Sequence, residues 1–371
     1  MNKVIEKAVA YFIRSTEPGL PTFEGESGER HFLRLWKEAS TCGLTRVGIP
    51  EAYGGWGGGG PEMGRLLSAL TRQSQSIGFS MALMISQIIA HFMIASKGTD
   101  EQKDAWLPPM AEGRFPSAFA VSEAKVGAHP ARLKTRGEKK EGDWILNGEK
   151  SYISNGPLAG LVVLVAVVGE EENGRKRFNT FLVPGKSYGM DHSGVMDLPF
   201  FKPAQHGTLE LNGVCVGPES VLGAEGSAYT EQVLPFRRYE DAMIMACATG
   251  GLEALLGDLV QRAKSGDASV CDLLGRFAAR KIALEYLALR CAELTKRVDS
   301  QAVHETEGMV IHFREAMGHC IEEVKGLLAQ GLTLTPVCNV LLADLEAAQG
   351  IGATLTDMKR KRMGRELIKA I

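Results

Sequence analysis

The chain has 371 residues, of which 44% are hydrophobic, and its formal net charge is −2 at pH 7. This length suggests two or three domains, each able to bury a core. The balanced charge gives no reason to expect nucleic acid or an anionic membrane as a partner, and the absence of about eighteen uninterrupted apolar residues argues against a transmembrane span.

Helical patterns predominate in the first part of the chain. The start could be mistaken for a signal peptide, but charged residues interrupt its apolar residues at helical spacing, which predicts an amphipathic helix instead. Farther along, a nearly all-apolar stretch predicts a buried helix pair. The expected helices cover about residues 1–15, 31–39 and 63–96, and another begins after a cap at Thr99 or Asp100.

The pattern then changes to that of strands. β-branched runs at 161–168 and 180–184 predict strands joined by a charged turn. Residues 207–216 are expected to complete the sheet, with Asn212-Gly213 supplying a turn that tolerates positive φ.

Helical patterns return after Gly223 and continue to the end, with breaks expected near Gly266 and at 333–336. The sequence therefore divides into an N-terminal helical domain over 1–112, a central β-domain over 113–222 and a C-terminal helical domain over 223–371.

The cysteine and histidine pattern predicts no metal site and no disulfide framework. The seven cysteines are odd in number and scattered, without a C-x-x-C pair or a Cys/His cluster. This usage fits a reducing cytoplasm. His91, His312 and His319 lie in apolar helical stretches and are expected to be core residues, and the methionines between Met81 and Met93 are expected to be packing residues.

The stretch from Ala118 to Asn155 carries the strongest indication of function. Apolar segments at 119–122 and 144–146 are expected to be short strands that flank loops rich in glycine and small hydroxyl side chains. Backbone N–H groups and hydroxyls can bond the polar edge of a flat ring, while an aromatic residue such as Tyr152 stacks on its face. The alternative is a pair of ordinary surface β-turns, because glycine and serine dominate all turns.

Residues 120–129 read A-V-S-E-A-K-V-G-A-H, and residues 147–155 read N-G-E-K-S-Y-I-S-N. They resemble the flavin-binding patterns A-x-T/S-E-P-x-A-G-S-D and N-G-x-K-x-W-I-T-N of the acyl-CoA dehydrogenase family. Further family landmarks stand at 49–55 and 98–109, so the resemblance covers about residues 30–225. It implies an α+β fold with an N-terminal helical domain, a central β-barrel-like domain and a C-terminal helical bundle.

The resemblance implies FAD as the cofactor. Val121 and Ser122 take the positions that contact the pyrimidine edge of the flavin, and Gly127 the position where backbone passes close to it. Tyr152 replaces the usual Trp and Ser154 the usual Thr, which keeps an aromatic face and a hydroxyl donor. The implied cofactor-binding residues are Phe119, Val121, Ser122, Gly127, Ala128, Tyr152, Ile153 and Ser154.

Several positions depart from the family pattern. Ala128 replaces a Ser that helps to hold the ligand in relatives, and His129 replaces the following Asp. The R-x-Q-F-G segment, which in relatives binds the flavin pyrophosphate of a neighbouring subunit, reads R-A-K-S-G at 262–266, and a Gly-Gly-x-Gly turn is reduced to Gly350-Ile351-Gly352. The basic run at 359–365 is either a grip for CoA or FAD phosphates or the solvated face of a terminal helix.

Family members remove the α-proton of an acyl thioester with a carboxylate base. In many relatives this is the Glu of a Y-E-G-T segment, but residues 349–354 here read Q-G-I-G-A-T and contain no acid. A minority of relatives place the base on the first helix after the β-domain, where either Asp241 or Glu240 can align with it, Asp241 being favoured by the register of the small residues. The alternative is a solvated helix start, where acids meet the helix dipole favourably.

The resemblance thus implies FAD-dependent α,β-dehydrogenation of an acyl-CoA thioester, with electrons passed to an electron-transfer flavoprotein. It also implies a homo-oligomer, or a hetero-oligomer with another acyl-CoA dehydrogenase subunit. The departures leave two alternatives open. One is a flavin-poor or half-catalytic subunit of a mixed acyl-CoA dehydrogenase complex, and the other is a family offshoot with another flavin reaction, such as monooxygenation or desulfination.

Overall fold

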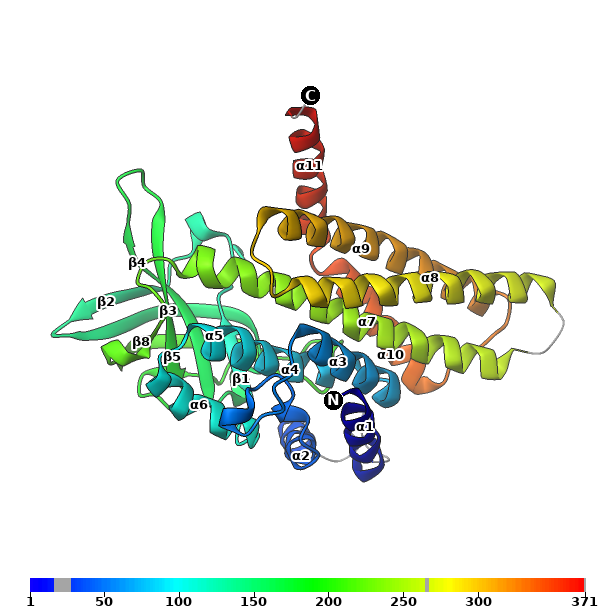
Figure 1. The fold of residues 1–371 in the computed structure, drawn as a ribbon, viewed down its shortest axis with the longest axis horizontal. Helices are drawn as coiled ribbons and strands as arrows, with labels where there is room; N and C mark the ends of the chain where they lie inside the picture. Colours follow the sequence, from blue (N-terminus) through cyan, green and yellow to red (C-terminus); the bar gives the residue numbers. More distant parts are fainter. Residues whose placement is uncertain (17–27, 264–266, 370–371) are drawn as a thin grey trace.

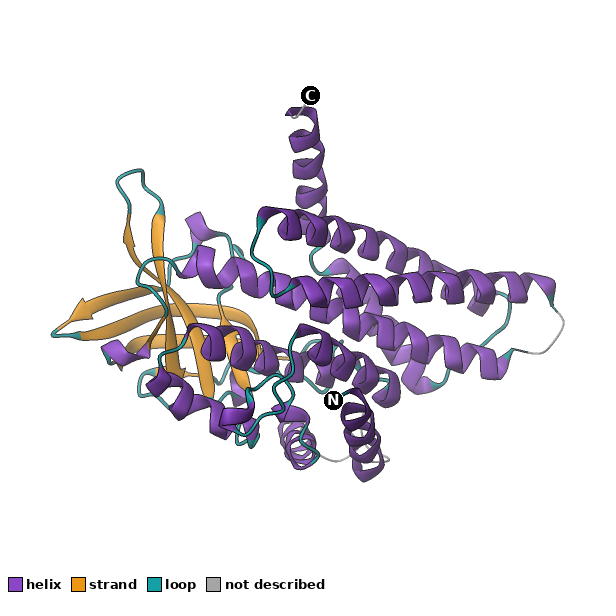
Figure 2. Ribbon diagram, in the orientation of Figure 1, coloured by secondary structure: helices purple, strands orange, loops and turns teal. Residues whose placement is uncertain are grey.

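The computed structural model describes residues 1–16, 28–263 and 267–369 (Figure 1). Helices come first, a sheet follows, and helices return, as expected (Figure 2). The sheet lies at one end of the molecule, and the long helices of the second helical part extend away from it (Figure 1).

The first helical part packs around one continuous apolar segment. Helix α4, the π-helical segment η3 and the short helix α5 follow each other directly, and almost every side chain of α4 is buried. Thr99 caps the next helix as expected, because its Oγ accepts from the N–H of Gln102 while the Gln102 side chain accepts from the N–H of Thr99. The elements are α1 (Asn2–Thr16), α2 (Gly28–Thr41), α3 (Gly60–Ser74), α4 (Ile77–Ile88), η3 (Ile89–Ile94), α5 (Ala95–Lys97) and α6 (Asp100–Ala111).

The central part is one mixed nine-stranded sheet. Its main path runs β6-β8-β3-β2-β4-β5-β9, with β1 parallel to β4 and β7 paired to β8 outside that path. The strands are β1 (Ser117–Ala120), β2 (Arg136–Lys140), β3 (Asp143–Ser154), β4 (Leu161–Glu170), β5 (Lys176–Pro184), β6 (Met190–Asp191), β7 (Val195–Met196), β8 (His206–Val216) and β9 (Val221–Leu222).

Two expectations about this sheet were wrong. Asn212-Gly213 is not a turn, because β8 continues through it and the register against β3 shifts there. Gly213 has a φ of +67°, and its N–H donates to the Asn147 side chain at 2.8 Å. The pair therefore makes a β-bulge. Residues 147–154 are not a loop either, since they belong to β3 and pair with β8.

The second helical part is a bundle of long helices from which the last helix projects (Figure 1). A π-helical segment, η7 (Tyr229–Val233), leads into it. The expected break at 333–336 is present, and an unpredicted one follows α8. Gly266, near which the other break was expected, lies outside the described residues, and α7 ends before it while α8 begins after it. The helices are α7 (Leu234–Arg262), α8 (Ala268–Leu294), α9 (Ser300–Ala329), α10 (Pro336–Gly350) and α11 (Ala353–Lys369).

Two long helical stretches in the described residues are apolar enough to cross a membrane by length and composition. They are Ile77–Lys97 and Tyr229–Arg262, and 89% and 72% of their most apolar windows are buried inside the protein. Their apolar character therefore serves the core, where α7 packs against α3 and α4.

The cysteines and histidines lie in different surroundings. All seven cysteines are free thiols, and no group of His, Cys, Asp or Glu in the described residues could hold a metal ion. His91 is partly buried, with Nδ1 3.0 Å from the carbonyl oxygen of Gly48. The expectation of core positions was wrong for His312 and His319, which are exposed because α9 buries the opposite face.

Candidate functional site

A bulge in strand β3 presents Tyr152 to solvent. The pairing of β3 with β8 shifts between Lys150 and Ile153, so β3 carries one extra residue there. Tyr152 has a φ of +61°, a backbone region that residues with a Cβ rarely adopt. Its side chain is 61% exposed, so the bulge holds an aromatic ring on the surface of the sheet.

The loop after β1 lies beside this bulge. The N–H of Ser151 donates to the carbonyl oxygen of Ser122 at 2.9 Å, which ties the loop to β3. The side chains of Val121 and Ile153 are buried, so Val121 offers a ligand only its backbone. We refer to Val121, Ser122, Tyr152 and Ser154 as the platform.

A buried ion pair lies behind the platform. Lys150 Nζ is 3.1 Å from Glu123 Oε1, and the two side chains are 0% and 9% exposed. The Glu123 carboxylate also accepts from the backbone N–H groups of Lys134 and Thr135. Burial by itself raises the pKa of Glu123, but Lys150 and these N–H groups outweigh it and lower the pKa below its ordinary value.

Asn155 joins the platform to the first helical part. Its side-chain Nδ2 donates to the carbonyl oxygens of Ala82 on α4, at 2.9 Å, and Ser117 on β1, at 3.0 Å. Asn155 itself has a φ of +63°, which asparagine tolerates better than most residues. Asn155 therefore holds helix α4, strand β1 and the end of strand β3 together next to Ser154.

The loop at Gly127 is open to solvent. Gly127 has a φ of +59°, and a Cβ there would meet no heavy atom within 4 Å. The neighbouring Ala128 is exposed, and its carbonyl oxygen accepts a hydrogen bond from Tyr229 of η7 at 2.9 Å. This contact attaches the loop to the segment that leads into α7.

These groups fit the isoalloxazine ring of FAD. Tyr152 supplies an aromatic face, Ser122 and Ser154 supply hydroxyl groups, and Gly127 allows a close approach. The structure offers fewer groups to the pyrophosphate of FAD. Arg262, the first residue of the segment that the resemblance assigns to the pyrophosphate, forms an ion pair with Asp258, with Nε 3.2 Å from its carboxylate. Residues 264–266 of the expected pyrophosphate segment lie outside the described residues.

Helix α7 meets the β-domain through aromatic contacts. The Phe236 and Phe119 rings are 4.2 Å apart, centroid to centroid. One turn later, Tyr239 stacks on Phe92 of η3 at 4.9 Å. Glu240 lies four residues after Phe236 and therefore on the same face of the helix.

The two candidate acids occupy different surroundings. Glu240 accepts from Arg237 at 3.0 Å, and its side chain is 24% exposed. Burial raises its pKa, with Arg237 acting in the opposite direction. Asp241 is 5% exposed and forms ion pairs with Lys359 of α11, at 2.8 Å, and with Arg237, at 3.3 Å.

Asp241 points toward α9, α10 and α11, where its ion-pair partner Lys359 lies. It lines a small hollow with side chains of α9, including Phe313 and Arg314, and with Ala348 of α10. Arg314 donates to the carbonyl oxygen of Ile351 at 3.1 Å, so it holds the turn where relatives carry the Y-E-G-T acid.

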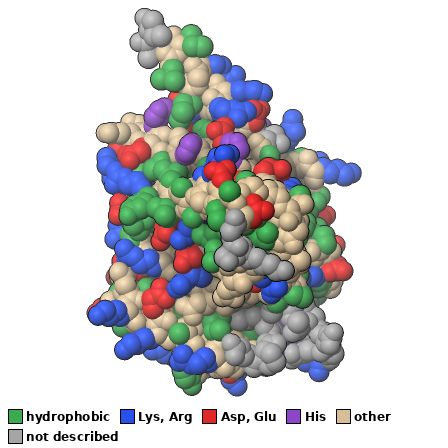
Figure 3. All heavy atoms as spheres, turned by 90° about the vertical axis from the view of Figure 1, so that its right-hand side faces the viewer, with side chains coloured by type: hydrophobic (Ala, Val, Ile, Leu, Met, Phe, Trp, Pro, Cys, Tyr) green, Lys and Arg blue, Asp and Glu red, His purple; other side chains and the backbone are tan. Residues whose placement is uncertain are grey.

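The basic run has mostly internal partners. Lys359 pairs with Asp241, Arg360 with Glu315 and Arg362 with Glu307. Basic side chains are visible along the projecting helix in Figure 3. These ion pairs dock α11 on α9 and α7 through charges and leave the rest of the run solvated.

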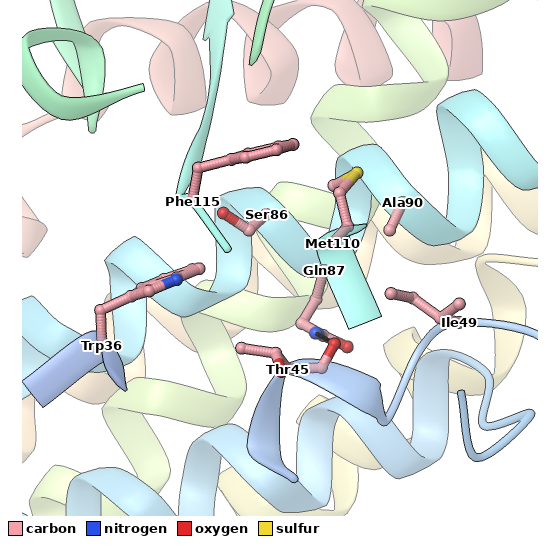
Figure 4. A pocket seen from close by; sticks show the side chains of 8 residues that line it. All are labelled: Trp36, Thr45, Ile49, Ser86, Gln87, Ala90, Met110 and Phe115. Carbon is pink, nitrogen blue, oxygen red and sulfur yellow. Dashed lines mark hydrogen bonds between the residues drawn. The ribbon is translucent and has the colours of Figure 1, made fainter. Parts of the chain in front are cut away.

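Another hollow lies within the first helical part (Figure 4), between side chains that include Trp36, Thr45 and Gln87. Its polar groups bond to the protein itself. Gln87 Nε2 donates to the Thr45 carbonyl at 2.7 Å, and Trp36 Nε1 donates to the Gly113 carbonyl at 3.0 Å. This hollow is a packing feature and carries no chemistry of its own.

Sequence reasoning missed several residues that shape the site. Lys150 and Glu123 belong to the quoted motifs but were not singled out, although both quoted family patterns carry a charged residue at these positions, which was a readable signal. Arg237 stands four residues before Asp241 on a predicted helix, so this i,i+4 ion pair could have been read from the sequence. Lys359 could not be linked to Asp241 in this way, because it stands 118 residues away.

Comparison with known proteins gives consistent matches. Residues 3–114 match the family model described as acyl-CoA dehydrogenase, N-terminal domain, and residues 118–214 match the one described as acyl-CoA dehydrogenase, middle domain. The acyl-CoA dehydrogenase FadE12 of Mycobacterium tuberculosis is 31% identical over 236 residues, which are 63% of this chain and 59% of that protein. The mitochondrial isovaleryl-CoA dehydrogenase of Solanum tuberosum is 25% identical over 356 residues, 91% of this chain and 83% of that protein.

Solved structures extend the likeness to the whole chain. The prolyl acyl carrier protein oxidase AnaB superposes with a TM-score of 0.81 at 20% identity, covering 98% of each chain. The butyryl-CoA dehydrogenase of Megasphaera elsdenii gives a TM-score of 0.81 at 20% identity, covering 99% of this chain and 98% of that one. At this identity the likeness shows the fold alone, and the fold agrees with the expected arrangement of helical, β and helical parts.

Proposed function

The chain belongs to the acyl-CoA dehydrogenase family, and from this premise we propose that it is a flavoprotein oxidoreductase that dehydrogenates an acyl-CoA thioester between its α and β carbons. The observation that carries the proposal is the platform, where the Tyr152 bulge and the Ser122 loop are fixed side by side through Ser151. It presents an aromatic face and polar donors together, the pair of features that a flavin ring requires.

FAD is the cofactor in this proposal, and when bound it accepts a hydride from the β-carbon. Ser122 and Ser154 would hold the polar edge of the ring, and Tyr152 would cover a face. Phe119, Val121 and Ile153 position these residues from the buried side, and Gly127 and Ala128 border the open loop. The pyrophosphate end would need help from beyond this chain, since Arg262 is paired with Asp258.

Glu240 is our first candidate for the base that accepts the α-proton. It shares the face of α7 with Phe236, which contacts β1 through Phe119. Burial raises its pKa, and a carboxylate with a raised pKa is a better proton acceptor near neutral pH. Asp241 stays the second candidate, because its two ion pairs and its position toward α9 require a rearrangement before it could reach a substrate.

The partners follow the same proposal. Electrons would pass to an electron-transfer flavoprotein, and the protein would act as a homo-oligomer or with another acyl-CoA dehydrogenase subunit. The free thiols fit a reducing cytoplasm. The similarity to an acyl carrier protein oxidase makes a carrier-bound thioester the alternative form of the substrate.

One observation favours a second function. The pairing of Arg262 with Asp258 withdraws the arginine that in relatives serves the flavin of a neighbouring subunit. A half-catalytic subunit, which binds its own flavin ring but does not complete a neighbour's site, would show this pattern.

The test is a visible absorption spectrum of the purified protein, recorded with FAD and then with a panel of acyl-CoA thioesters under anaerobic conditions. Flavin that binds and bleaches with one thioester supports the dehydrogenase. Flavin that binds but bleaches only after a second dehydrogenase-like chain is added supports the half-catalytic subunit. A protein that takes up no FAD, either alone or with the second chain added, overturns both.

A further inference from the structure

Lys150 is a charged side chain with no exposed surface, placed behind the platform. Besides its ion pair with Glu123, its Nζ donates to the carbonyl oxygen of Val121 at 2.9 Å. Burial lowers the pKa of Lys150 to about 8, with Glu123 acting against this shift. Since apolar residues of similar volume often replace buried ion pairs without loss of stability, stability alone does not account for this cation.

The hydrogen bond donated by Lys150 is made to the peptide group between Val121 and Ser122. The Val121 carbonyl and the Ser122 N–H belong to the same peptide, and a cation that bonds the oxygen draws electron density and strengthens the N–H as a donor. Among the hydrogen bonds of the described residues, none is donated by the Ser122 N–H. Lys150 holds the Val121 carbonyl of this peptide, and Ser151 holds the next peptide through the Ser122 carbonyl, so the Ser122 N–H lies between two fixed groups.

We propose that Lys150 is a positioning residue for the flavin, because it fixes and polarises the Val121–Ser122 peptide so that the Ser122 N–H donates to an acceptor on the pyrimidine edge of the ring. The inference rests on the proposed function, since it requires flavin at the platform. Reduction adds negative charge to that edge, so a donor backed by a cation stabilises reduced flavin more than oxidised flavin.

Three variants of the chain test the proposal. Lys150→Met removes the cation, the double variant Glu123→Gln/Lys150→Met removes both charges and leaves no lone buried carboxylate, and Lys140→Met changes an exposed lysine of the same sheet as the control. FAD affinity is measured by flavin fluorescence, the midpoint potential of the bound flavin by dye-linked titration, and folding by thermal melting.

The double variant is expected to melt near the wild-type temperature yet bind FAD about tenfold more weakly, the equivalent of one charge-assisted hydrogen bond. Its flavin potential is expected to be more negative than that of wild type and of Lys140→Met. A purely structural role for Lys150 would instead leave the affinity and potential of a well-folded double variant unchanged, and that result overturns the inference while leaving the proposed function intact.

A measurement on the wild-type chain needs no substitution. Glu123 is the charged group that faces Lys150 among the described residues, and its lowered pKa keeps it ionised at neutral and alkaline pH. FAD affinity is therefore expected to fall as pH rises through about 8, where Lys150 loses its charge. An affinity that stays constant across this range in wild type, as in the double variant, contradicts the inference, and a wild type that binds no FAD overturns it together with the proposed function.

Discussion

The rings of Phe119 and Phe236 lie 4.2 Å apart, centroid to centroid, at the point where strand β1 meets helix α7. Phe236 is 3% exposed, so this contact is part of the core that joins the β-domain to the second helical part. Because Glu240 follows one turn later on the same face of α7, the contact also sets where that carboxylate lies relative to the platform.

Replacing Phe236 by Ala is expected to lower the free energy of unfolding by about 3 kcal/mol, because a large buried ring leaves a cavity that the neighbours only partly fill. Urea denaturation checks this value. Leu234→Ala, on the same helix but 51% exposed, is the control and is expected to change little. Equal losses for the two variants would show that the Phe119–Phe236 contact does not contribute as proposed.

Glu240→Gln is expected to lower kcat about a thousandfold, the scale of a lost general base, while FAD still binds. Asp241→Asn is expected to keep most of the activity. Because burial raises the pKa of Glu240 and a base must be ionised, kcat/KM is expected to rise with pH through a value above the ordinary glutamate pKa of about 4.3. The opposite ranking of the two variants would identify Asp241 as the base.

Lys359→Met is expected to destabilise the protein by about 2 kcal/mol, because it removes one partner of Asp241, which is 5% exposed. Adding Asp241→Asn to Lys359→Met should recover much of this loss, because the buried carboxylate that had lost its partner is then replaced by a neutral amide. A double-mutant cycle with the single variants measures the coupling. A coupling near zero would mean that the ion pair does not dock α11.

Asp344 of α10 is buried, at 2% exposure, and accepts a hydrogen bond from the Phe201 N–H at 2.7 Å. Burial raises its pKa to about 6, with that N–H acting in the opposite direction. A raised pKa means that the folded protein binds the proton more tightly than the unfolded chain. The stability that Asp344 contributes is therefore fully present below its unfolded pKa of about 3.9 and is lost as pH rises through about 6.

Asp344→Asn keeps the acceptor oxygen without the charge, so it is expected to stabilise the protein by about 3 kcal/mol at pH 7.5 and by much less near pH 4. Thermal melting at both pH values checks this, with the exposed Asp104→Asn on α6 as the control. A stabilisation that is the same at both pH values would show that charge at Asp344 is not the cause.

The sequence by itself determined the order of the helical, β and helical parts and most of the longer elements within them, although it placed residues 147–154 in a loop and Asn212-Gly213 in a turn. Local patterns suffice for this, because apolar periodicity follows from helix and strand geometry and the cap at Thr99 depends on neighbours three residues apart. The motifs at 120–129 and 147–155 indicated where the proposed flavin site lies for the same reason, since each is a continuous stretch.

Only the tertiary structure decided which way side chains point and what they meet. The bulge that exposes Tyr152 arises from the register of β3 against β8, and the burial of Lys150 depends on a loop that follows another strand. Asp241 has different surroundings from Glu240 because it pairs with Lys359, which stands 118 residues later in the chain. A one-residue change of register turns a side chain to the opposite face of a strand, and one step along a helix turns it by about 100°, so these choices are settled by packing between segments that are distant in the chain.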